Sequence, residues 1–134
     1  MIFNSYSEIK DLKYDVVIVG GGPAGISLAL ELENKKISTL ILEAGKNNFS
    51  EESQEFYNGT VIGDDYPPLS VTRLRQLGGS SGHWGGVCRT LEDHDFINWP
   101  IEKKDLEIYS DKAKKTINLK RNNFFKKKID KDFD

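Results

Sequence analysis

The sequence predicts an α/β fold built on a strand–helix–strand unit near the N-terminus. Two short runs, YDVVIV at 14–19 and TLIL at 39–42, have the continuous apolar and β-branched composition of buried strands. Between them, residues 23–34 repeat apolar side chains at helical spacing. A strand, a helix and a strand within about 30 residues indicate a βαβ unit, with parallel strands and a right-handed crossover.

The rest of the chain is less regular. Residues 46–72 are rich in Asn, Gly and Pro and predict a long loop with one short helix around Glu51 to Phe56. After a turn-rich connection, WPIEKKDLEIYSDKAKKTI predicts a second amphipathic helix that begins near Lys103. The predicted organisation is therefore a polar leader at 1–13, one incomplete α/β domain at 14–117 and a charged, disordered tail at 118–134.

Length and charge limit the possible classes of protein. At 134 residues, the chain is long enough for one modest domain. The net charge of −2 points to no particular partner, although residues 1–98 are acidic on balance and residues 99–134 are basic. Because the basic end alternates with acids and has no aromatic platform, it indicates a solvated tail, and we expect no nucleic-acid binding.

The single cysteine, Cys88, excludes an internal disulfide, a CxxC redox pair and a thiolate metal cage within these residues. It is expected to be a small buried side chain. The N-terminus lacks a signal-peptide pattern, and no apolar run approaches the roughly 18 residues of a membrane span. We therefore expect a cytoplasmic, soluble protein with no membrane segment.

A glycine motif joins the first strand to the helix. Gly20, Gly22 and Gly25 in VIVGGGPAG form GxGxxG, and the acidic Glu43 ends the second strand 18 positions after the last glycine. In this context the motif predicts a dinucleotide site: the glycines allow a sharp turn and a close approach, the helix N-terminus attracts a diphosphate, and the acid accepts ribose hydroxyls. The candidate binding residues here are Gly20, Gly22, Pro23, Ala24, Gly25, Glu43 and Ala44.

A second glycine cluster, GGSSGHWGGVC at 78–88, follows an arginine-bearing segment. Taken together, DVVIVGGGPAG, LILEAG, RLRQLGGSSGHWGG and WPIEKKDLEIY resemble the N-terminal part of a glucose-methanol-choline (GMC) oxidoreductase. The resemblance implies a partial Rossmann-like FAD-binding domain from an enzyme that oxidises an alcohol or sugar by passing a hydride to flavin N5. It also implies that the second cluster lies against FAD. The residues implied there are Arg73, Gly78, Gly79, Ser80, Ser81, His83 and Trp84.

His83 carries a further implication of the resemblance. In family members with a covalent flavin, a histidine at the matching place bonds to the flavin 8α-methyl carbon, and Trp84 is similar to the pyranose oxidase pattern. His83 either forms that bond as a neutral imidazole nucleophile or packs beside the flavin. His94 is expected in a surface turn, and no metal site is expected. Trp99 and Tyr109 are expected in the core.

The resemblance covers only part of such an enzyme. Its catalytic histidine lies downstream in family members, so no catalytic residue is expected in this chain, which is interpreted as an incomplete copy of a larger protein. The alternative is a non-catalytic FAD or nucleotide-binding module that works with a partner chain. A flavin disulfide reductase is disfavoured because there is no CxxC, and an NAD-linked dehydrogenase because the second glycine cluster would have no role in it.

Overall fold

The structure is a computed structural model that describes residues 1–119. The chain divides into two units, residues 1–87 and residues 88–134, and each is described by itself. The division falls inside the domain predicted at 14–117, and that predicted range, like the leader at 1–13, stays a prediction. Most of the predicted tail, residues 120–134, lies outside the described residues.

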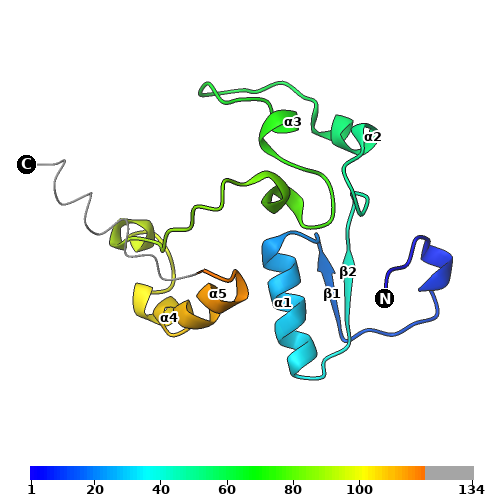
Figure 1. Cartoon of the computed structure of the whole chain (residues 1–134), viewed down its shortest axis with the longest axis horizontal. Coiled ribbons are helices and arrows are strands. Elements are labelled where there is room, and N and C mark those ends of the chain that lie inside the picture. Colours follow the sequence, from blue (N-terminus) through cyan, green and yellow to red (C-terminus); the bar gives the residue numbers. More distant parts are fainter. Residues whose placement is uncertain (120–134) are drawn as a thin grey trace, which may run out of the picture. The chain divides into compact units, whose positions relative to one another are not determined.

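The first unit contains the predicted βαβ unit (Figure 1). Strands β1 (Val16–Val19) and β2 (Thr39–Leu42) pair in parallel, with Val16 opposite Thr39 and Val19 opposite Leu42. Helix α1 (Pro23–Asn34) joins them and contacts both strands. The α/β fold class and the incomplete Rossmann-like unit are therefore confirmed.

The prediction that the strands are buried is wrong for most of their side chains. Among the described apolar residues only Ile18 is buried, whereas Val17 is 53% and Val19 86% exposed. A parallel sheet needs cover on both faces, and a two-stranded sheet beside one helix leaves part of its apolar surface uncovered. The sequence pattern is that of a strand in a larger sheet.

Short helices hold the long loop of this unit. They are α2 (Glu51–Gln54), η2 (Glu55–Tyr57) and α3 (Leu69–Thr72), while a further short helix, η1 (Tyr6–Glu8), precedes β1. The helix expected around Glu51 to Phe56 is thus present as α2 and η2. The loop itself is tied to α2 by Gln54, whose Nε2 donates to the carbonyls of Ser70 and Arg73 and whose Oε1 accepts from the Arg75 amide (3.1 Å). The buried Gln54 side chain thus holds the backbone just before the second glycine cluster.

The regular elements in the described part of the second unit are short helices. It contains η4 (Asp93–Phe96), α4 (Lys103–Glu107) and α5 (Ser110–Thr116). The prediction of one continuous helix from Lys103 is wrong. The helix is interrupted at Ile108 and Tyr109, where the Tyr109 amide donates to the carbonyl of Leu106, three residues earlier.

The prediction that Trp99 and Tyr109 lie in a core is also wrong. Trp99 is 51% and Tyr109 60% exposed, because the short helices offer little surface to pack against. Trp99 makes an edge-to-face contact with Phe96, with ring centroids 5.8 Å apart. Cys88 is exposed rather than buried.

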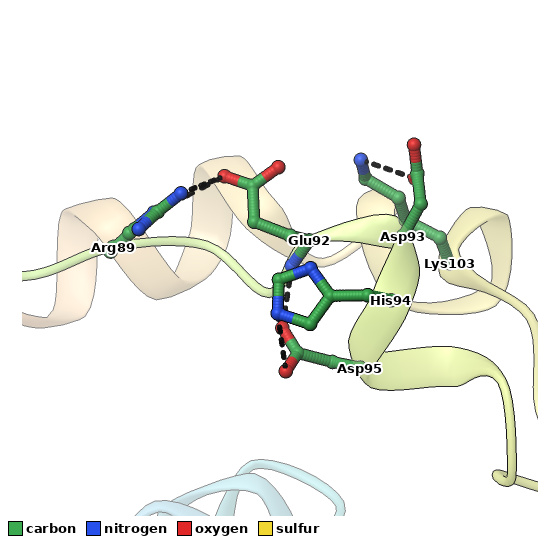
Figure 2. A network of polar contacts seen from close by, with 6 residues as sticks. All are labelled: Arg89, Glu92, Asp93, His94, Asp95 and Lys103. Carbon is green, nitrogen blue, oxygen red and sulfur yellow. Dashed lines mark hydrogen bonds and ion pairs between the residues drawn. The ribbon is translucent and has the colours of Figure 1, made fainter.

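A surface network of charges links η4 to α4 (Figure 2). Lys103 Nζ lies 2.8 Å from Asp93 Oδ1, and this hydrogen bond lowers the pKa of the Asp93 carboxyl and raises the pKa of the Lys103 ammonium. Arg89 pairs with Glu92 at 2.9 Å, and His94 Nε2 lies 3.5 Å from Asp95 Oδ1. His94 is exposed on η4, which agrees with the expected surface position.

Candidate functional site

The fingerprint turn has the backbone that its glycines predict. Gly20 has a φ of +102°, which favours glycine, and its amide donates to the Leu42 carbonyl (2.8 Å). A side chain at Gly25 would collide with the Gly20 carbonyl, so helix and strand pack closely there. Gly22 caps α1 without a side-chain hydrogen bond, and the first turn of the helix contains no acidic residue. No side chain of the first turn therefore caps the positive end of α1.

The second glycine cluster packs against this turn. We call Gly78–Ser81 the glycine–serine segment. The Gly78 amide donates to the Gly21 carbonyl (2.7 Å), and the Leu77 amide to the Lys46 carbonyl (3.0 Å). Gly78 and Gly79 both have positive φ angles, and a methyl group at Gly79 would lie 3.4 Å from Gly22 Cα. The two glycine motifs, far apart in the sequence, are thus adjacent in space.

Glu43 lies where these segments meet. It follows β2 directly, and the parallel register places it next to the fingerprint turn at the carboxyl end of β1. One carboxylate oxygen, Oε2, accepts from the Gly21 amide, and the other, Oε1, accepts from the Gly45 amide, both at 2.7 Å. The residue is half-buried. Both oxygens are therefore engaged by the protein's own backbone.

A cavity of about 430 Å³ opens between the fingerprint turn, the end of β2 and the glycine–serine segment. Its volume lies within the roughly 300–1,000 Å³ range of small-molecule pockets. Eight of the predicted binding residues line it, namely Gly20, Gly22, Pro23, Glu43, Ala44, Gly79, Ser80 and Ser81. The remaining lining residues, which the sequence did not single out, are Val19, Leu42, Tyr57, Leu74, Arg75 and Gln76.

Six predicted residues do not line the cavity. They are Ala24, Gly25, Arg73, Gly78, His83 and Trp84. Gly25 and Gly78 have the structural roles given above. His83 ends the short helix η3 (Gly79–His83), two positions after Ser81, and both His83 and Trp84 are exposed.

Arg75, rather than Arg73, is the arginine among the residues that line the cavity. Its guanidinium donates to Ser53 Oγ (2.9 Å) and lies 4.4 Å from the ring centroid of Phe56. Arg73 is exposed and donates to the carbonyl of its neighbour Thr72. Two arginines separated by one residue in an extended segment look alike in the sequence, so only the contacts with α2 and η2 distinguish them.

Among residues 1–119, no group of three or more His, Cys, Asp or Glu side chains is arranged to hold a metal ion. Within the same residues, no helix has both the length and the apolar character needed to cross a membrane.

The sequence also matches known proteins. The family model described as pyridine nucleotide-disulphide oxidoreductase matches residues 14–131. The chain belongs to this family. It is 30% identical over 107 residues to a pyranose dehydrogenase of Agaricus xanthodermus, and this match covers 67% of the chain and 18% of that enzyme. It is 28% identical over 119 residues to an oxygen-dependent choline dehydrogenase of Staphylococcus aureus (strain JH9), covering 75% of the chain and 21% of that enzyme. No solved structure matches.

These matches confirm the resemblance to GMC oxidoreductases, because both relatives are of that type. The chain therefore belongs to a family of FAD-dependent oxidoreductases, and it matches their FAD-binding domain. The disulphide in the family's description has no counterpart in these residues, since Cys88 is the only cysteine. The chain spans about a fifth of the length of the curated relatives that it matches.

Proposed function

We propose that the cavity binds FAD, with the diphosphate at the N-terminus of α1, and that the whole protein oxidises the CH–OH group of a small-molecule alcohol or sugar. The observation that carries the proposal is the uncapped start of α1 at the cavity wall. A methyl group at Gly22 would meet no protein atom within 4 Å, so a phosphate can approach the backbone there.

The other lining residues suit the same ligand. Glu43 keeps acceptor capacity for ribose hydroxyls, because an ionised carboxylate has about four lone-pair sites and two are used. Arg75 also lines the cavity, and a positively charged residue there suits a diphosphate. Ser80 and Ser81 are held in place, since Ser80 Oγ accepts from the Leu74 amide and Ser81 Oγ donates to the Gly78 carbonyl.

When bound, flavin supplies a hydride acceptor at N5, and the residues of this chain hold it against the two glycine motifs. Binding is tested by titrating the purified chain with FAD, NAD and FMN in a calorimeter. FAD should bind more tightly than FMN, because the cavity is built around the diphosphate and the adenosine ribose. A protein that binds NAD and no flavin would contradict the proposal. Oxidation is tested on the whole protein by loss of flavin absorbance when an alcohol or sugar is added.

Covalent attachment through His83 is the finer form of this proposal. It is supported by the position of His83, which follows the cavity-lining Ser81 by two residues and is not buried by other side chains. An imidazole nitrogen would lose its proton and bond to the 8α carbon, which would lose one hydrogen of its methyl group. The two protons and two electrons released would pass through the flavin to dioxygen, which would leave as hydrogen peroxide. After acid precipitation, flavin should remain in the pellet of the whole protein and be absent from the pellet of His83→Ala. Free flavin in the wild-type supernatant would show that His83 only packs beside the ring.

The second candidate function is a non-catalytic FAD-binding module that works with a partner chain. The exposed apolar side chain of Val17, at 53%, favours it, because Val17 does not line the cavity and a partner chain would cover it. Turnover separates the two candidates. A flavin that alcohols reduce supports the oxidoreductase, and a bound flavin that no alcohol reduces supports the module.

A further inference from the structure

We infer that Glu43 is a positioning residue that places the glycine–serine segment against the fingerprint turn. This inference rests on the proposed function for its relevance to FAD, and it assigns Glu43 a role beyond contact with a ribose. The feature that carries it is the pair of 2.7 Å hydrogen bonds from the Gly21 and Gly45 amides to the two different carboxylate oxygens.

The first bond joins Glu43 to the fingerprint turn. The Gly21 amide donates to Glu43, and the carbonyl of the same residue accepts from the Gly78 amide at 2.7 Å. A methyl group at Gly21 would lie 2.9 Å from Leu77 Cδ1 and 3.0 Å from Glu43 Oε2, so the three residues are in close contact. Gly21 is buried between them. The carboxylate therefore holds Gly21 on its amide side, while the carbonyl of the same residue holds Gly78.

The second bond fixes the segment that follows β2. The Gly45 amide donates to Glu43, and the next residue, Lys46, accepts from the Leu77 amide at 3.0 Å. A side chain at Gly45 would collide with the backbone of Arg75, which shows how closely the two segments approach. Lys46 and Gln76 also form a parallel β-bridge.

Both routes lead to neighbouring residues. The Leu77 and Gly78 amides each donate one hydrogen bond to a carbonyl in a backbone segment that Glu43 holds, and neither amide bonds to Glu43 itself. One carboxylate thus sets the place where the glycine–serine segment begins. A neutral amide cannot do the same, because its nitrogen carries hydrogens and cannot accept from a backbone amide.

The test is amide hydrogen exchange on the ligand-free chain, wild type and Glu43→Gln, followed residue by residue by NMR. If Glu43 is a positioning residue, exchange at Leu77 and Gly78 should accelerate at least tenfold in Glu43→Gln. The Gly20 amide, which bonds to Leu42 within the βαβ unit, should change much less and reports global unfolding. The matched control is Glu33→Gln, an exposed glutamate on α1, which should leave all three amides unchanged.

One result would overturn the inference. If Glu43 acts only on a ribose, the amide hydrogens of Leu77 and Gly78 will exchange at the same rate in ligand-free Glu43→Gln as in the wild type. Should Glu43→Gln fail to fold, the wild type decides: slow exchange of the Gly21 and Gly45 amides supports the inference, and exchange at the rate of unstructured peptides overturns it. No flavin is present in either experiment, so failure of this inference and failure of FAD binding are seen separately.

Discussion

Replacing Gly22 with alanine should weaken FAD binding while leaving the fold nearly intact. The added methyl group would meet no protein atom within 4 Å, and the φ of −81° is open to any residue. The cost to folding is then the weaker N-cap preference of alanine, about 0.5–1 kcal/mol. The methyl group would instead occupy the place of approach to the helix N-terminus.

The expected loss of affinity follows from one hydrogen bond. A phosphate displaced from a helix amide loses a charge-assisted bond worth about 1.5–3 kcal/mol. Since 1.4 kcal/mol is tenfold in the dissociation constant, the affinity for FAD should fall roughly 10- to 100-fold. Calorimetric titration measures this fall, and thermal unfolding followed by circular dichroism measures the stability of the same variant.

Gly25→Ala is the matched control with the opposite behaviour. Its methyl group would collide with the Gly20 carbonyl and lie 3.2 Å from Ile18 Cγ2, so the variant should lose about 1–3 kcal/mol of folding free energy. An FAD affinity for Gly22→Ala equal to that of the wild type would refute the reasoning. So would a Gly22→Ala variant that is less stable than Gly25→Ala.

Three more predictions concern other contacts. Arg75→Met should lower FAD affinity about tenfold and Arg73→Met should not, because only Arg75 lines the cavity; equal effects in calorimetry would contradict this. Gln54→Ala should cost about 1–3 kcal/mol in urea unfolding, since it leaves buried backbone groups unpaired, and a change within about 0.5 kcal/mol would contradict it. Lys103→Met should raise the pKa of Asp93 toward its ordinary value in an NMR titration. Because the Asp93 pKa is lowered in the folded state, the ion pair contributes above the unfolded carboxyl pKa and its contribution is lost as pH falls through the folded one. Its contribution is lost again as pH rises through the raised pKa of Lys103.

Periodicity and motif spacing predicted the βαβ unit closely. Helix α1 and strand β2 have the predicted ranges, because the glycine turn, the proline at the start of the helix and the apolar run leave little choice of boundary. The motifs also predicted most of the cavity lining. They did so because GxGxxG and the following acid lie directly after the two strands. The pairing of these strands brings both motifs to the same edge of the sheet.

Properties that depend on distant surroundings were not predictable in the same way. The exposure of Val19 and Cys88 depends on how much protein covers them, which local composition does not report. The break at Tyr109 occurs in a sequence with good helical periodicity, where the packing that sustains a helix is absent. The role of Arg75 depends on Ser53 and Phe56, residues about twenty positions away.

The bond between Gly78 and Gly21 has a consequence for the order of folding. Gly78 and the preceding Leu77 donate to the carbonyls of Gly21 and Lys46, which are in place only after β1, α1 and β2 have assembled. Closing the long loop between β2 and this segment costs conformational entropy, and only a few hydrogen bonds offset that cost once the loop is closed. We therefore expect this segment to form after the transition state, so that Ser80→Ala speeds unfolding and leaves the folding rate unchanged. A ligand that bridges the two glycine motifs would then prolong the life of the folded state without hastening its formation.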